Sequence, residues 1–144
     1  MTNAELVYKW FDEVWNNKNE KAIYELMAPG CIAHGLQDEA GNELAGPEKF
    51  AGLFKSFVHS FPDIHITVDD TVTEGNKIAA RTTVTLSHTG HPFQVNANKL
   101  IAPSGKQLTF PGMFIAIIAN DQLAEAWNNY DFLSMYVQLG AISM

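Results

Sequence analysis

The hydrophobic pattern of the chain changes its period once, near residue 64. Before this point apolar residues recur every three or four positions, which is typical of helices that bury one face. After it they alternate with polar residues, which is typical of half-buried strands. Because the helices precede the strands, the pattern predicts an α+β fold in which helices pack on one face of an antiparallel sheet.

Three N-terminal helices are predicted. Thr2 and Glu5 have the spacing of a capping box at the start of the first helix. The second helix is short and follows Asn19, while the third begins after Gly46 and closes at Pro62. The third helix has the clearest apolar face, which consists of Phe50, Leu53, Phe54, Phe57, Val58 and Phe61.

The strands are bounded by turn residues. A strong twist is expected to curl the sheet into a cone around the helices. The predicted elements are a short strand at 31–34, a loop at 37–46, strands around 64–68 and 78–86, strands at 93–101 and 107–118, a last strand that ends near Asp131, and a terminal turn of helix at 132–139.

Composition excludes several classes of function. The 144 residues of a single domain, 1–144, carry a net charge of −7, which does not suit a nucleic-acid surface. No apolar run approaches the roughly 18 to 20 residues that span a membrane, and the acidic start is unlike a signal peptide. We therefore expect a cytoplasmic protein without nucleic-acid or membrane partners. Cys31 is the only cysteine, which excludes a disulfide framework and a cysteine-based zinc site.

Cofactor chemistry has no support in the sequence. None of the 5 histidines forms the helical pair of a zinc protease. His88 and His91 could chelate a metal, although a polar turn is the commoner role of such a pair. The chain contains neither a glycine-rich phosphate loop nor a nucleophile elbow. We expect no metal and no cofactor.

The fold and the aromatic content together predict a pocket. Helices cannot fill the whole concave face of a curled sheet, so an apolar pocket with few polar groups should remain. The chain has 9 Phe, 4 Tyr and 3 Trp residues to line it or to fill the core. A hydrophobic small molecule is the ligand that this pocket predicts.

The last strand carries most of the candidate chemistry. Alternation places Glu125, Trp127 and Asp131 on one face, and Asn128 and Tyr130 on the other. A carboxylate beside an apolar pocket could act as a general base near neutral pH. The alternative for Asp131 is to cap the terminal helix. His88 fits either the pocket rim or the core, and His34 ends a strand beside a loop, where it could face the pocket mouth.

Six short motifs suggest a family. In their order, and over nearly the whole chain, the sequence resembles the SnoaL-like polyketide cyclases (ester cyclases) of the nuclear-transport-factor-2-like superfamily. The motifs are Phe61-Pro62-Asp63, Glu74-Gly75-Asn76, His88-Thr89-Gly90, Pro103-Ser104-Gly105-Lys106, Glu125-x-Trp127-x-x-x-Asp131 and Gln138-Leu139-Gly140.

The resemblance implies a cone-shaped α+β fold, a dimer through the sheet, and no cofactor or metal. It also implies a lyase or isomerase in which a pocket Asp removes a proton next to a carbonyl group, as in intramolecular aldol cyclisation. Many relatives read Glu-His-Trp-Asp in the last strand, where this chain has Ala126 and Asn128. Asparagine cannot serve as a general base. The base is lost if its position is 128 and retained if it is Asp131.

We expect one pocket, with Asp131, His88 and His34 as catalytic residues and an apolar oxygenated molecule as substrate. The reaction would be an aldol cyclisation, isomerisation or dehydration by acid–base chemistry. Two alternatives are a non-catalytic binder of a hydrophobic molecule and a structural dimer whose aromatics fill the pocket. The expected substrate-binding residues are Tyr8, Trp15, Phe54, Val58, Phe114, Trp127 and Asn128.

A homodimer is also predicted from the pattern itself. Strand residues between 93 and 118 are apolar on both faces, so a second subunit could cover the face that the helices leave open. The residues are Val95, Ala97, Ile101, Phe110, Phe114 and Ile118 in one set, and Leu100, Met113, Ile115 and Ile117 in the other.

Overall fold

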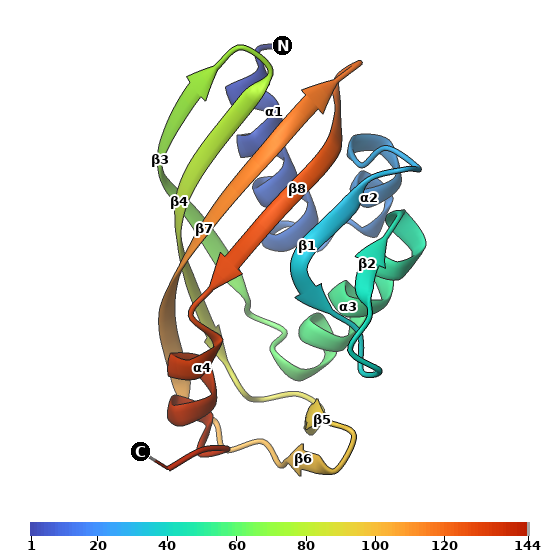
Figure 1. The fold of residues 1–144 in the computed structure, drawn as a ribbon. Coiled ribbons are helices and arrows are strands. Elements are labelled where there is room, and N and C mark those ends of the chain that lie inside the picture. Colours follow the sequence, from blue (N-terminus) through green and yellow to red (C-terminus); the bar gives the residue numbers. More distant parts are fainter. Residues whose placement is uncertain (144) are drawn as a thin grey trace.

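The computed structural model describes residues 1–143 and contains helices, a large sheet and a small hairpin (Figure 1). In chain order the elements are α1 (Asn3–Trp10), a π-helix (Phe11–Asn16), α2 (Glu20–Leu26), β1 (Ile32–Gln37), β2 (Glu43–Ala45), α3 (Pro47–Ser60), β3 (His65–Glu74), β4 (Lys77–Ser87), β5 (Phe93–Asn96), β6 (Lys99–Ile101), β7 (Gln107–Ala119), β8 (Gln122–Tyr130) and α4 (Phe132–Leu139).

The predicted α+β architecture is confirmed. Six strands form one sheet in the order β2-β1-β8-β7-β4-β3. Figure 1 shows α1, α2 and α3 behind this sheet, with the opposite face of the sheet turned toward the viewer. Burial of the apolar faces of the helices against the inner face of the sheet creates one core.

Local signals fix the helix ends as the sequence predicts. The Thr2 hydroxyl accepts from the Glu5 amide, and the Glu5 carboxylate accepts from the Thr2 amide, which completes the capping box. Pro47 occupies the first turn of α3, where its missing N–H costs no hydrogen bond. The first predicted helix differs at its end, because the turn from Phe11 to Asn16 is wound as a π-helix.

The sheet is mixed rather than wholly antiparallel. β1 pairs with β8 in parallel, with His34 opposite Trp127, while the other pairings are antiparallel. β1 lies at the edge of β8, the last strand of the sheet in chain order, and runs in the same direction. Alternation along a strand does not reveal its neighbour, which explains why the sequence did not predict this pairing.

One loop assignment and one strand assignment were wrong. Residues 37–46 contain the short strand β2, in which one buried residue, Leu44, lies between two exposed ones. Three residues are too few to show a period. Residues 93–101 form a separate hairpin, β5–β6, instead of one strand of the main sheet. Within residues 1–143 no helix is both long and apolar enough to span a membrane.

Candidate ligand-binding site

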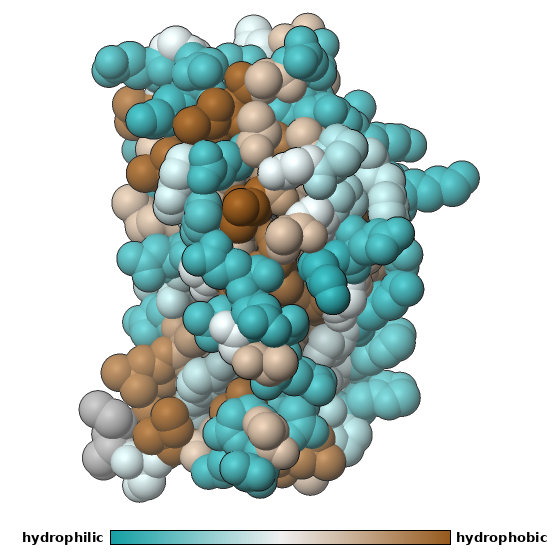
Figure 2. Space-filling model, turned by 45° about the vertical axis from the view of Figure 1, so that its right-hand side comes forward, coloured by the Kyte–Doolittle hydropathy of each residue, from teal (hydrophilic) through white to brown (hydrophobic). Residues whose placement is uncertain are grey.

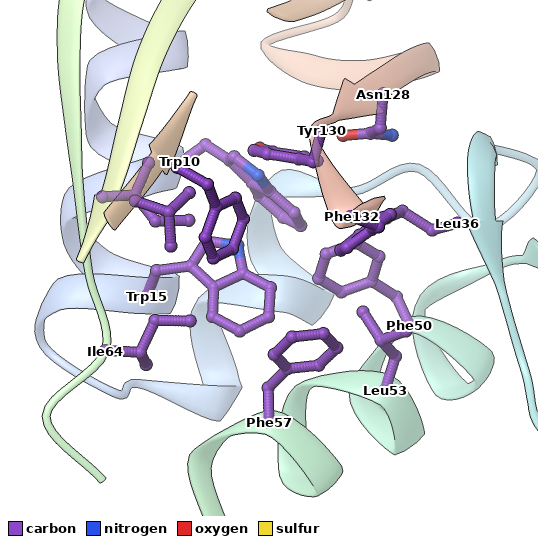
Figure 3. Close-up of a pocket in the computed structure, with 13 residues that line it drawn as sticks. Trp10, Trp15, Leu36, Phe50, Leu53, Phe57, Ile64, Asn128, Tyr130 and Phe132 are labelled. Carbon is purple, nitrogen blue, oxygen red and sulfur yellow. The ribbon is translucent and has the colours of Figure 1, made fainter. Parts of the chain in front are cut away.

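An inner crevice lies between the helices and the concave face of the sheet (Figure 3). Its free space is about 40 Å³, roughly that of one or two water molecules. The walls are largely aromatic and come from α1, the π-helix, α3, β7 and the start of α4. The rings involved are Trp10, Trp15, Phe50, Phe57, Phe110 and Phe132.

Asn128 brings an amide into this apolar crevice from β8. Its Nδ2 donates to the backbone oxygen of His34 at 3.1 Å, which orients the side chain. β1 approaches β8 closely here: a Cβ atom on Gly35 would lie 1.8 Å from the backbone oxygen of Asn128. Gly35 has a φ of +83°, a conformation that other residues rarely adopt. The close approach keeps the Asn128 amide tied to β1, and no hydrogen bond from residues 1–143 to its Oδ1 is found.

Tyr130 is the second polar group of the crevice. Burial raises the pKa of its phenol well above the usual value, and a hydrogen bond with Thr82 opposes part of that shift. The phenol is therefore protonated at neutral pH. Because the Thr82 hydroxyl donates its proton to the Gly112 oxygen at 3.0 Å, the phenol O–H is the donor, either toward Thr82 or toward a ligand. Its ring lies over Gly112, where an added Cβ atom would come within 2.1 Å of the ring. Figure 3 shows Asn128 and Tyr130 at the same end of the crevice.

Among residues 1–143, those that line the inner crevice include no carboxylate and no histidine. The deep end therefore has an amide and a neutral phenol as its polar groups. This set can hold a carbonyl or hydroxyl oxygen by hydrogen bonds. It contains no group able to take a proton at neutral pH.

A wider groove of about 690 Å³ opens beside the crevice. It is lined by residues of the β1–β2 loop, α3, β5 and α4. Figure 1 shows β5 and α4 toward the lower end of the molecule. Leu36, Leu53, Phe57 and Phe132 line both cavities. The groove therefore lies directly next to the crevice.

The structure corrects the expected position of Asp131. This residue is the N-cap of α4, and its carboxylate accepts from the Ser134 amide at 2.9 Å. Asp131 is exposed and lines neither cavity. The sequence left position 128 or 131 as the place of a base, and the residue that faces the crevice is Asn128.

His88 also lies outside both cavities. It is fully buried, with its ring against Phe61 at a centroid distance of 5.1 Å. Its Nε2 lies 3.0 Å from the backbone oxygen of His91, while its Nδ1 has no hydrogen-bond partner within residues 1–143. The core position that the sequence offered as an alternative is the one His88 occupies.

His34 lies on the other side of the sheet, away from the crevice. Its Nδ1 is 2.6 Å from Glu43 and its Nε2 is 2.6 Å from Glu125. The hydrogen bond to Glu125, followed by the contact with Glu43, raises the pKa of His34. Its ring stacks on Trp127 at 5.4 Å, and 38% of Trp127 is exposed. His34 and Trp127 form a charged and aromatic cluster on the outer face.

The residues that were expected to share a single pocket therefore do not all line one cavity. Of the expected substrate-binding residues, Trp15 and Asn128 line the crevice. Tyr8 is 40% exposed, and Val58 lines neither cavity. Phe54 packs behind the crevice wall on Trp15, and Phe114 packs on Phe11 in the core.

Sequence reasoning missed Tyr130, although the alternation along β8 placed it on the same face as Asn128. It also missed Trp10, whose apolar stripe on α1 does not distinguish a crevice wall from core. No cluster of three or more histidine, cysteine or acidic residues within 1–143 is arranged to hold a metal ion.

The family model described as SnoaL-like polyketide cyclase matches residues 5–139. No curated protein matches the chain. A candidate SnoaL-like polyketide cyclase from Jannaschia sp. CCS1 is 23% identical, with a TM-score of 0.78 over 98% of this chain and 93% of the other. IdmH from Streptomyces antibioticus, a candidate polyketide cyclase, is 20% identical, with a TM-score of 0.79 over 97% and 99% of the two chains.

A protein with a ketosteroid isomerase-like fold from Catenulispora acidiphila, solved in complex with trimethylamine, is 16% identical. Its TM-score is 0.74 over 96% of this chain and 95% of the other. At these identities the solved structures establish a shared fold, which is the fold that the order of helices and strands predicts.

Proposed function

The chain belongs to the SnoaL-like polyketide cyclase family, and we propose that it binds an apolar, oxygenated small molecule in the inner crevice. Aromatic walls supply the contact area for a flat hydrophobic ligand. Tyr130 donates a hydrogen bond to an oxygen of the ligand, and the amide oxygen of Asn128 accepts one from a ligand hydroxyl. Binding, without proton transfer by the protein, is the function that this set of groups supports best.

The observation that carries this proposal is the amide at position 128. A general base must lie within hydrogen-bond reach of the proton that it removes. The residue at the deep end of the crevice is Asn128, and Asp131 caps a helix outside it. A ligand could therefore be held with its oxygen oriented but without a carboxylate beside it.

Entry requires side chains to move, because about 40 Å³ is less than the volume of one aromatic ring. Leu53 and Phe132 separate the crevice from the groove and are both half-buried. Rotation of such side chains is fast compared with binding. We propose that these two residues swing toward the groove when a ligand enters.

Two matched probes test the binding site. 2-Acetylnaphthalene has a carbonyl group, and 2-ethylnaphthalene has a similar shape without it. Tyr130→Phe removes the phenol hydroxyl and should weaken binding of the acetyl probe by about fivefold, the equivalent of one neutral hydrogen bond of about 1 kcal/mol. The ethyl probe should be unaffected. Equal losses for both probes, or none for either, would contradict the role of Tyr130.

An enzyme is the second candidate, and the protonated phenol favours it. Enolisation next to a carbonyl is common to aldol cyclisation and isomerisation. Tyr130 would hold the carbonyl oxygen as negative charge develops on it. The proton would pass from carbon to a solvent base that enters through the groove, since the crevice itself has none.

Hydrogen–deuterium exchange at the methyl group of 2-acetylnaphthalene separates the two functions. For a binder, exchange in the presence of the wild-type protein is no faster than in buffer. Asn128→Asp should then accelerate it at least tenfold, because a carboxylate contributes general-base catalysis. Exchange by the wild type that depends on Tyr130 and on buffer-base concentration would instead establish the enzyme.

A homodimer through the sheet is proposed as the assembly. The outer face of the sheet presents Met113, Ile115 and Trp127 with exposed fractions between 38% and 54%. Figure 2 turns this face toward the left, where hydrophobic side chains gather. Monomers seldom expose such a patch, and a second copy that buried it would place the two crevices on opposite sides of the dimer.

A further inference from the structure

We propose that the outer groove is a second subsite, which holds a hydrophilic and non-anionic part of the same ligand. This inference rests on the proposed function, because it concerns the part of the ligand that extends beyond the inner crevice. The ligand class is then an amphiphile, with a flat apolar part in the crevice and a hydroxyl-rich or basic part in the groove.

The two cavities form one path. Leu36, Leu53, Phe57 and Phe132 line both, so the two cavities adjoin and side chains common to both lie between them. The cavities differ in chemistry along this path. The inner crevice has Asn128 and Tyr130 as its polar residues, whereas the groove is lined by carboxylates, amides and hydroxyls along with apolar groups. Such a gradient fits a ligand with two unlike ends.

Gly52 supports the subsite independently. It lies inside α3, where a glycine weakens a helix relative to alanine. No packing requires it, since a Cβ atom at this position would meet nothing within 4 Å. Gly52 lines the groove. Its missing side chain therefore keeps the groove wide at the cost of helix stability, which is what a binding surface on α3 needs.

The charges of the groove select against anions. Asp38, Glu39 and Glu48 line it, and Lys49 is its sole lysine or arginine within residues 1–143. Asp38 already accepts from the amides of Ala40 and Asn42. Glu39 and Glu48 are exposed, and no hydrogen bond or ion pair involving them is found within residues 1–143.

The other polar side chains of the groove include Gln37, Gln94, Asn96 and Tyr136. Gln94 uses its Nε2 on backbone oxygens of the β5–β6 hairpin, which leaves its amide oxygen as an acceptor. The Oδ1 of Asn96 accepts from the Asn98 amide, which leaves its Nδ2 as a donor. The groove thus offers both donors and acceptors, which suit the hydroxyl groups of a sugar, and its carboxylates suit a protonated amine.

Three naphthalene probes test the subsite: 2-methoxynaphthalene, 2-naphthyl β-glucoside and 2-naphthyl β-glucuronide. They share the aromatic part and differ in having no appendage, a neutral hydroxylated one or an anionic one. We expect the glucoside to bind the wild type at least threefold more tightly than the methoxy probe. The glucuronide should bind at least threefold more weakly than the glucoside. This difference in affinity should shrink in 0.5 M salt.

Gly52→Trp narrows the groove beside α3. It should weaken the glucoside at least tenfold more than the methoxy probe, whose own loss reflects the reduced space into which Leu53 and Phe132 swing. Gly30→Trp is the matched control, because a Cβ at Gly30 also meets nothing within 4 Å and this residue lines neither cavity. A circular-dichroism melt of each variant checks that it is folded.

The outcomes separate the two proposals. If the methoxy probe binds but the glucoside gains nothing, or if Gly52→Trp weakens both probes equally, the subsite is overturned and the proposed function stands. If no probe binds the wild type, the proposed function fails and the subsite fails with it. Tighter binding of the glucuronide than of the glucoside would overturn the charge selection.

Discussion

Asp131 accepts a hydrogen bond from the Ser134 amide at the start of α4. Loss of such a cap typically destabilises a protein by about 1 kcal/mol, whereas asparagine caps almost as well as aspartate. We predict that Asp131→Ala lowers the free energy of unfolding by about 1 kcal/mol and that Asp131→Asn changes it little. Urea unfolding measures both. Asp131→Asn should also bind 2-acetylnaphthalene normally, and a large loss of binding or turnover would restore Asp131 to the site.

His34 gives the stability of the chain a pH dependence. Because Glu125 and Glu43 raise its pKa, the folded chain holds this proton more tightly than the unfolded chain does. The stabilisation is complete below the ordinary value of 6.5 and is lost as the pH rises through the raised value. Above it, two carboxylates face a neutral ring.

We therefore predict that the stability difference between wild type and His34→Gln is largest at pH 6 and shrinks toward pH 9. Urea unfolding across this range measures it. His65→Gln is the matched control, since His65 is exposed on β3 and has no ion pair within residues 1–143. A stability difference for His34→Gln that stays constant with pH would contradict the network.

At the scale of elements, β8 supplies the polar side chains of the crevice and α4 closes the crevice on the groove side. β8 sends Asn128 and Tyr130 into the crevice and Trp127 to the outer face, as alternation along a strand requires. α4 starts directly afterwards, so Phe132 closes the crevice on the groove side. The length of β8 thus decides that residue 131 caps a helix instead of facing a ligand.

Phe132 provides a prediction for α4. Phe132→Ala removes the ring that separates crevice and groove, so 2-acetylnaphthalene should associate at least threefold faster. Stopped-flow quenching of tryptophan fluorescence measures the rate. Leu133→Ala on the same helix is the control, because Leu133 is 53% exposed and lines neither cavity. An unchanged rate for Phe132→Ala would show that entry does not pass this ring.

The sequence predicted individual helices and turns better than it predicted which strands pair with each other. The periodicity of α3 and the turn at Glu74-Gly75-Asn76 are local signals, and the structure contains both features. The parallel β1–β8 pair depends on contacts between residues about 90 positions apart, which leave no local trace. The site prediction failed for the same reason. The sequence placed His34 and His88 at strand ends, whereas His34 lies inside β1 and His88 follows β4. Whether each residue faces the crevice, the core or the outer surface depends on the assembled sheet.

At the scale of the whole molecule, the two faces of the sheet have different tasks. The inner face packs on the helices and leaves the crevice, while the outer face exposes Met113 and Ile115. If this face forms a homodimer, light scattering should give twice the chain mass of 15.9 kDa. Ile115→Arg should yield the monomer, because a charge would be buried without a partner.

Tyr24→Arg is the control for that variant, since Tyr24 is an exposed aromatic on α2, away from the sheet face. It should leave the mass unchanged. A wild-type mass of 15.9 kDa at micromolar concentration would contradict the dimer without affecting the ligand site.

The central claim is that a ligand binds in the inner crevice. Its most direct test is to find which tryptophans are quenched when the ligand binds. Trp10 and Trp15 line the crevice, whereas Trp127 lies on the outer face. Titration of the wild type with 2-acetylnaphthalene should give saturable quenching that Trp127→Phe preserves and the double substitution Trp10→Phe, Trp15→Phe abolishes. Quenching that persists in the double variant and disappears in Trp127→Phe would place the ligand on the outer face of the sheet and contradict the account.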